Sequence, residues 1–111
     1  MTRVSVILCT KDRPAELMRV LDSLAMQSRR PDEVIVVDAS REPILPRIRD
    51  RLGRFAAYKY LHTTPSLTAQ RNRGIDESTG DLIFFFDDDV ILEANYLERM
   101  VHVFEQDTEQ R

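Results

Sequence analysis

Three consecutive carboxylates, Asp87–Asp89, follow an apolar run and are the residues of this sequence best suited to chemistry. The run Leu82–Phe86 comes soon after Gly80 and is continuously apolar, which predicts a strand buried on both faces. Neighbouring carboxylates at the mouth of a strand repel one another, and partial burial adds a desolvation cost. A bound Mg²⁺ or Mn²⁺ would relieve both costs, because hard oxygen ligands suit these cations. The alternative is an acidic turn that ends the strand and keeps its edge soluble.

The composition is that of an ordinary globular domain. A chain of 111 residues makes one domain or part of one, with 42% apolar and 32% charged residues. The net charge is -3 with both signs mixed along the chain, and nothing in this pattern suggests a basic footprint for nucleic acid or a polybasic membrane patch. The single cysteine, Cys9, excludes an internal disulfide framework and is expected to be a buried, inert thiol. No signal peptide or membrane-spanning stretch is visible, so a reducing cytoplasmic setting is expected.

Apolar periodicity alternates between strands and helices along the chain. Strand-like runs cover residues 4–9, 33–38, 56–61 and 82–86. Helical periodicity follows each run, from Pro14 to about residue 28 and then over 44–52, 67–78 and 93–105. This alternation predicts an α/β domain with a Rossmann-like, mostly parallel sheet and flanking helices. Residues 106–111 are polar and are expected to fray.

Acidic residues follow three of the predicted strands. Right-handed crossovers place the carboxyl ends of parallel strands along one edge, where open α/β sheets bind ligands. Asp12, Asp38 and the Asp87–Asp89 cluster should therefore meet there. Acids are also favoured at helix N-termini, and capping of the helix that begins at Pro14 explains Asp12 equally well. Neither G-x-G-x-x-G nor a Walker A sequence occurs, which argues against a dinucleotide or P-loop site.

An arginine is expected on the inner face of the third predicted helix. Its apolar stripe is defined by Leu67, Gly74 and Ile75. At about 100° per residue, Arg71 falls inside this stripe and Gln70 lies at its edge. A buried guanidinium needs a partner, because an unpaired buried charge is costly. That partner is either a carboxylate of the core or the anion of a ligand.

Four sequence blocks, taken in order, resemble the N-terminal, nucleotide-binding half of a GT-A fold glycosyltransferase of family 2. The blocks are Val4–Ile7 through Thr10 and Arg13, Val36–Ser40, Ala69–Gly74 and Gly80–Asp89, with Leu24 and Gln27 in an S-L-x-x-Q setting. Each block alone is weak evidence, whereas four at the family's spacing are specific. The resemblance covers nearly the whole chain.

The resemblance implies a donor-nucleotide site built from all four blocks: Thr10, Arg13, Asp38, Arg71, Asp87 and Asp88. In this interpretation Thr10 and Asp38 help to hold the base and the ribose, and Arg71 contacts the nucleotide. Asp87–Asp89 matches the D-x-D motif of the family. Asp87 and Asp89 would bind Mn²⁺ or Mg²⁺, and the cation neutralises the diphosphate that leaves as the sugar transfers.

The implied activity is metal-dependent transfer of a sugar from a nucleotide-diphosphate sugar to an acceptor hydroxyl, with inversion. The acceptor would be a saccharide, a lipid-linked sugar or a protein, and a full-length parent is expected in the cytoplasm, peripheral at the inner face of the membrane. The family's domain is about twice as long, so residues 1–111 are interpreted as a nucleotide-binding part truncated before the acceptor half. The catalytic base would lie in the missing half, and no catalytic residue is assigned here. The isolated segment is expected to be inactive and to self-associate through an uncovered sheet edge.

One departure from the family's pattern concerns the donor base. Many members carry a second acid at the position of Ala39, and that acid can contact the base of the donor nucleotide. Because this sequence lacks it, the resemblance does not identify the base. Two other functions compete with the glycosyltransferase. A receiver-like, non-enzymatic metal-binding module would place its acids after the first and third strands. A nucleotidyltransferase would have a glycine-rich basic loop after the first strand, and Thr10–Arg13 lacks the glycines.

Overall fold

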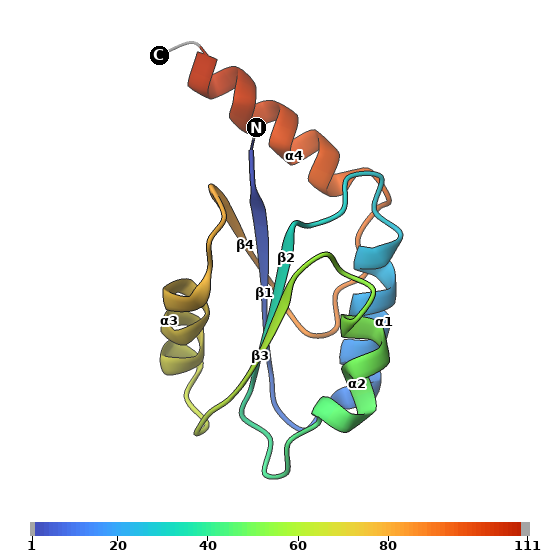
Figure 1. Cartoon of the computed structure of the whole chain (residues 1–111), viewed down its shortest axis with the longest axis vertical. Helices are drawn as coiled ribbons and strands as arrows, with labels where there is room; N and C mark the ends of the chain where they lie inside the picture. The colour runs from blue at the N-terminus through green and yellow to red at the C-terminus, as the bar shows by residue number, and fades with distance from the viewer. Residues whose placement is uncertain (1, 110–111) are drawn as a thin grey trace.

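The computed structural model describes residues 2–109 as four strands that alternate with four helices (Figure 1). The strands are β1 (Val4–Thr10), β2 (Glu33–Asp38), β3 (Tyr58–His62) and β4 (Leu82–Phe86). The helices are α1 (Pro14–Ala25), α2 (Leu45–Leu52), α3 (Leu67–Glu77) and α4 (Tyr96–Glu109). The alternation predicted from apolar periodicity is therefore confirmed.

All strand pairs are parallel, and the order across the sheet is β3-β2-β1-β4. From β1 to β3 each strand adds to the same side, so right-handed crossovers put α1 and α2 on one face. The chain then crosses back over two strands to β4, which puts α3 on the opposite face (Figure 1). The predicted α/β class with a parallel sheet and flanking helices is confirmed.

The larger core lies between the sheet, α1, α2 and the start of α4. The helical period predicts an inward stripe of Leu17, Leu21, Leu24 and Ser28, flanked by Val20 and Ala25. Leu17, Val20, Leu21 and Leu24 are buried, whereas α1 ends at Ala25 and Ser28 is exposed beyond it. Fully burying one such side chain contributes about 1.5–3 kcal/mol relative to exposing it. Packing of this apolar face thus fixes α1 against β1 and β2.

The smaller core lies under α3, around Ile7, Ile35 and Val37. Here the helix approaches the sheet so closely that a Cβ added to Gly74 would lie 2.5 Å from Cγ2 of Ile7. Gln70, one turn earlier, is also buried, and its amide donates hydrogen bonds to the carbonyl oxygens of Thr10 (3.2 Å) and Val37 (3.0 Å).

The predicted inner stripe of α3 is only partly correct. Gly74 is buried as expected, but Leu67 and Ile75 are 55% and 44% exposed, and Arg71 is also exposed. The line of Gln70 and Gly74 faces the sheet instead. The reason is the close approach of the helix at Gly74, where a side chain would collide with Ile7, and the two hydrogen bonds that turn Gln70 toward the sheet.

The prediction that β4 is buried on both faces is wrong. β4 is an edge strand, and α3 packs over β1 and β2 rather than over it. Ile83 and Phe85 are therefore 38% and 40% exposed on that face. Phe84 and Phe86 point to the larger core, where both rings contact Tyr96.

Several element ends differ from the predicted ones. β3 begins at Tyr58, and α4 begins at Tyr96, three residues after the predicted start at Glu93. Helix α4 includes residues 106–109, and residues 110–111 lie outside the described part of the chain, so the fraying expected for 106–111 stays a prediction. No helix among the described residues is long and apolar enough to span a membrane.

A buried carboxylate, Glu33, closes the amino edge of the sheet. Its Oε1 accepts hydrogen bonds from Ser5 Oγ (2.9 Å) and from the backbone N–H of Thr79 (2.9 Å). Its Oε2 lies 3.8 Å from Lys59 Nζ and 3.9 Å from Arg3 Nη2. Burial alone would raise the pKa of Glu33, but the bonds from Thr79 and Ser5 and the charge of Lys59 hold that pKa below its ordinary value.

We predict that Glu33→Gln lowers the free energy of unfolding by about 2 kcal/mol at pH 7, because a charge-assisted cluster loses its anion. The depressed pKa means that Glu33 stabilises the fold above its unfolded pKa of about 4.3, and that this contribution disappears as the pH falls through the folded pKa. Urea unfolding at several pH values measures both effects. Glu42→Gln is the control, since Glu42 is exposed and has no ion pair within residues 2–109. Equal stability of the two variants would contradict the prediction.

Candidate functional site

The carboxyl ends of β1 and β4 meet at one edge of the sheet, and the acid cluster lies there. Thr10, the last residue of β1, donates a hydrogen bond from Oγ1 to Oδ2 of Asp88 at 2.9 Å. The parallel register places Leu8 opposite Phe86, so the residues that follow both strands remain neighbours. This edge is where open α/β sheets bind ligands.

Arg13 brings two of the three clustered carboxylates together. Its Nε lies 3.4 Å from Oδ1 of Asp88, and its Nη2 lies 3.4 Å from Oδ2 of Asp89. Glu16, one turn into α1, approaches the same guanidinium at 3.8 Å. Asp88 is only 13% exposed, whereas the side chains of Arg13 and Asp89 are 46% and 55% exposed.

Asp12 holds the loop that presents Arg13, and it does not cap α1. The N-cap residue is Arg13, without a side-chain capping bond. Asp12 has φ 55°, in the left-handed region that is uncommon for a residue other than glycine. Its N–H donates to Ser40 Oγ (2.7 Å), and its Oδ1 accepts from the N–H of Arg41 (3.3 Å). The loop after β1 is thereby tied to the loop after β2, and the capping interpretation of Asp12 is wrong.

Asp38, the last residue of β2, is fully buried and turned into its own loop. Oδ1 accepts from the N–H of Ser40 (2.9 Å), and Oδ2 accepts from the N–H of Ile44 (3.0 Å) and from the hydroxyl of Tyr60. Burial alone would raise the pKa of Asp38, but these hydrogen bonds outweigh burial and hold the pKa below its ordinary value. The carboxylate thus shapes the loop after β2.

Asp87 and Arg71 lie together on the α3 side of the acid cluster. They line a small cavity of about 90 Å³ with Cys9 and Phe86, among others. The Arg71 guanidinium lies over the ring of Phe85, 5.9 Å from its centroid, and makes no ion pair within residues 2–109. The alternative in which Arg71 pairs with a core carboxylate is therefore wrong for the described residues. Burial raises the pKa of the Cys9 thiol, against the lowering effect of Arg71, so this half-buried thiol stays protonated.

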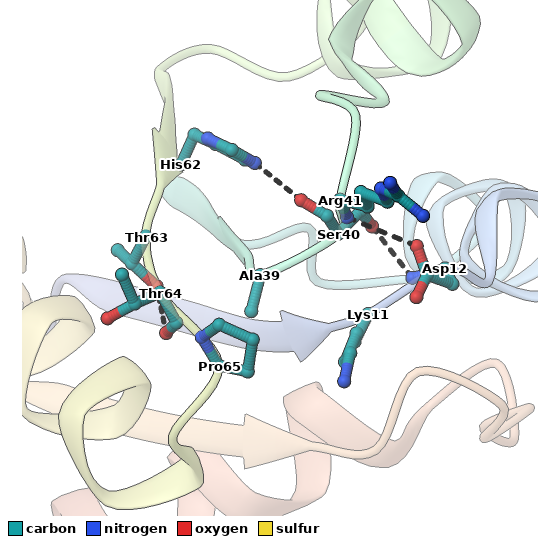
Figure 2. Close-up of a pocket in the computed structure, with 9 residues that line it drawn as sticks. All are labelled: Lys11, Asp12, Ala39, Ser40, Arg41, His62, Thr63, Thr64 and Pro65. Atoms are coloured by element: carbon teal, nitrogen blue, oxygen red, sulfur yellow. Dashed lines mark hydrogen bonds between the residues drawn. The ribbon is translucent and has the colours of Figure 1, made fainter.

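A larger open cavity of about 490 Å³ lies at the carboxyl ends of β1, β2 and β3 (Figure 2). Its lining residues come from three loops: Lys11, Asp12, Ala39, Ser40, Arg41, His62, Thr63, Thr64 and Pro65. Figure 2 shows the small side chain of Ala39 near the middle of this group, and His62 Nε2 lies 2.7 Å from the carbonyl oxygen of Ser40. Most of these residues were not predicted as site residues. Their position directly after predicted parallel strands is the signal that could have identified them.

The segment after the acids is anchored to the last turn of α1 and to the turn that follows the helix. Ser23 Oγ accepts from the N–H of Leu92 at 3.2 Å. The side-chain amide of Gln27 donates to the carbonyl oxygen of Glu93 (2.6 Å) and accepts from the N–H of Leu97 (3.0 Å). Gln27 is 4% exposed, so both bonds are protected from water. Helix α1 therefore contacts the acidic segment at both of its ends.

The residues present fit a divalent cation that completes its coordination with ligands from outside the chain. Within residues 2–109 no three His, Cys, Asp or Glu side chains are grouped so as to hold a metal ion. Asp88 and Asp89, however, supply hard oxygen donors, and both already approach one positive charge, the Arg13 guanidinium. A cation that brings phosphate oxygens with it would complete such a site.

The sequence matches a known family over almost its entire length. Residues 5–110 match the sequence model described as glycosyl transferase family 2. The uncharacterized glycosyltransferase YwdF of Bacillus subtilis is 28% identical over 103 residues, which are 93% of this chain and 38% of that protein.

Solved structures share the fold. S. aureus TarS has a TM-score of 0.83 at 24% identity over 94% of this chain and 32% of that chain, and one of its structures is a complex with UDP-GlcNAc. The mannosyltransferase PcManGT of Pyrobaculum calidifontis, in complex with GDP-Man and Mn²⁺, has a TM-score of 0.78 at 23% identity over 90% of this chain and 31% of that chain. This chain spans about a third of the length of these proteins.

We predict that Tyr60→Phe lowers the free energy of unfolding by about 2 kcal/mol at pH 7, because a hydrogen bond to the buried, charged Asp38 is lost. The difference from wild type should shrink as the pH falls through the depressed pKa of Asp38, since the bond is made to the carboxylate. Urea unfolding measures it. Tyr58→Phe is the control, because Tyr58 is exposed and its hydroxyl has no hydrogen bond in the described part of the chain. Similar stabilities for the two variants would contradict the prediction.

Proposed function

Because this chain belongs to glycosyltransferase family 2, we propose that it is the donor-binding part of an enzyme that transfers a sugar from a nucleoside diphosphate sugar to an acceptor hydroxyl. The observation that carries the proposal is the meeting of Thr10, Arg13, Asp88 and Asp89 at the carboxyl edge of the sheet. An open cavity for a nucleoside lies at the same edge. The complexes of TarS with UDP-GlcNAc and of PcManGT with GDP-Man support this class of donor.

The nucleoside is proposed to bind in the large cavity. Its volume of about 490 Å³ lies in the range of small-molecule sites. Thr10 stands at the border between the cavity residue Lys11 and the acid cluster, where the ribose would lie. Asp38 would act on the nucleoside by fixing the loop that carries Ala39 and Ser40, because its own oxygens are occupied by that loop and by Tyr60.

The diphosphate and the sugar are proposed to lie over the acid cluster. Asp87 and Asp89 are the proposed metal ligands, with Asp88 beside them, and the complex of PcManGT with Mn²⁺ supports a divalent cation. When bound, such a cation neutralises negative charge on the leaving diphosphate. Arg71 would add positive charge on the α3 side, next to Asp87.

Transfer itself is proposed to need residues outside this chain. Inversion at the anomeric carbon requires a base within hydrogen-bond reach of the acceptor hydroxyl. The acids at this edge are engaged with Arg13, Thr10 or backbone groups, or are proposed metal ligands. The relatives are about three times as long and have room for an acceptor site.

We predict that Mn²⁺ and a nucleoside diphosphate bind together to residues 1–111. Isothermal titration calorimetry with UDP and with GDP, each with and without Mn²⁺, should show affinity that rises with the metal, because the phosphates supply further ligands. Asp89→Asn should lower the Mn²⁺-dependent affinity by about tenfold or more, since a proposed ligand is lost. Asp50→Asn, at an exposed position on α2 without a partner in the described chain, is the control. If Asp89→Asn bound Mn²⁺ and the nucleoside diphosphate as tightly as the control, the proposed metal site would be contradicted.

We also predict that the isolated chain transfers no sugar and self-associates. Transfer should be absent because the base is missing, and association should follow from the open edge of β4 with its exposed Ile83 and Phe85. Chromatographic assay of nucleoside diphosphate release and light scattering measure the two properties. Ile83→Lys should reduce association, because a charge on an edge strand opposes pairing.

Two outcomes would contradict this prediction. Turnover by residues 1–111 that is lost in Asp89→Ala would place the base within this chain. A strictly monomeric protein at high concentration would refute the self-association.

A further inference from the structure

In this structure the cation between Asp88 and Asp89 is the side chain of Arg13. The two nitrogen–oxygen distances are 3.4 Å each, and one guanidinium spans both carboxylates. A metal ion bound by these carboxylates would have to occupy the space beside or in place of the guanidinium. The metal and Arg13 therefore compete for Asp89, a proposed metal ligand, and for the space next to Asp88.

We propose that Arg13 is a positioning residue that makes cation binding depend on the diphosphate. Without diphosphate, the guanidinium occupies the oxygens of Asp88 and Asp89. When the diphosphate binds, the guanidinium turns to its phosphate oxygens and releases both carboxylates to the cation. The inference rests on the proposed function. It adds that the diphosphate binds before the carboxylates become available to the cation, which the donor site alone does not require.

The contacts of Arg13 allow such a movement of the side chain. Its ion pairs are long and partly exposed, and pairs of this kind contribute about 0–1 kcal/mol each. A diphosphate offers charged oxygens that a planar guanidinium binds in pairs, which is a stronger interaction. The backbone need not follow, because Asp12 is tied to Ser40 and Arg41 immediately before Arg13.

The carboxylate partner is held more firmly than the arginine. Asp88 is 13% exposed, and its Oδ2 also accepts the hydroxyl of Thr10 at 2.9 Å, a bond that does not involve Arg13. Movement of the guanidinium therefore leaves Asp88 in position to meet a cation. Within the pair of Arg13 and Asp88, the arginine is thus the more mobile partner.

This arrangement predicts a specific pattern of affinities. The cation alone binds weakly because it must displace Arg13, and the diphosphate alone binds weakly because it meets three carboxylates. Together they bind more tightly, and thermodynamic linkage requires each to strengthen the other by the same factor. Without Arg13, the cation alone should bind more tightly and the coupling should decrease.

The test compares Arg13→Gln with the wild-type chain and with Arg19→Gln. Both variants lose one positive charge on or next to α1, but Arg19 is exposed and has no ion pair within residues 2–109. Mn²⁺ binding is measured by electron paramagnetic resonance with and without UDP or GDP, and thermal unfolding verifies the fold. In Arg13→Gln, Mn²⁺ alone should bind about two- to fivefold more tightly, and the coupling to the diphosphate should fall by a similar factor or more. Arg19→Gln should match wild type.

The other outcomes separate the inference from the proposed function. Equal tightening of Mn²⁺ binding in both variants would show a general effect of charge and would overturn the inference. Unchanged coupling in Arg13→Gln, with Mn²⁺ and diphosphate still binding together, would overturn the inference and leave the proposed donor site intact. Absence of Mn²⁺ binding to all three proteins, with or without diphosphate, would overturn the proposed metal site and the inference with it.

Discussion

Two hydrogen bonds from the amide of Gln70, to the carbonyl oxygens of Thr10 and Val37, support the edge of the sheet on which the site is built. These carbonyls lie at the ends of β1 and β2, and that of Thr10 also accepts from the N–H of Ala39 at 2.9 Å, so Gln70 adds a second link across this edge. The close approach of α3 at Gly74 brings the amide of Gln70 within reach of both carbonyls. The backbone of Thr10 is thus held from two sides, by Ala39 and by Gln70, while its hydroxyl donates to Asp88, which follows the neighbouring strand β4.

The sequence predicts the fold well where the apolar pattern of a helix or strand is enough to indicate which of its residues are buried. The inward stripe of α1 and the runs of β1 and β2 follow from periodicity alone, and the GT-A fold implied by the resemblance is confirmed by the fold shared with TarS. The exposure of β4 was not predictable, because an apolar run does not say whether its strand is central or at an edge. The face of α3 was mistaken for a related reason: contact through Gly74 and Gln70 violates the rule that the largest apolar residues face inward.

The candidate site was predictable in part. The resemblance identified Thr10, Arg13, Asp88 and Asp89, which the structure brings together. The pairing of Arg13 with the acids could not be predicted, because it depends on the register between strands that are about 75 residues apart in the sequence. The buried role of Glu33 could not be predicted, because an acid at the start of a strand usually faces water. Its hydrogen-bond donors come from another strand and a distant loop.

The anchoring of the acidic segment to α1 also bears on how such a domain can diversify. The bonds from Ser23 and Gln27 reach backbone groups of Leu92, Glu93 and Leu97, so they constrain the path of the segment and leave its side chains unspecified. Helix α1 has 12 residues and is about 18 Å long, enough to reach from the acids to the start of α4. Substitutions at the exposed positions Ile91, Ala94 and Asn95 can therefore change the surface offered to a substrate, whereas Leu92 packs against the larger core. Helix α1 and the turn after it thus fix the backbone of the segment that follows the acids, and the exposed side chains of that segment can vary with the substrate.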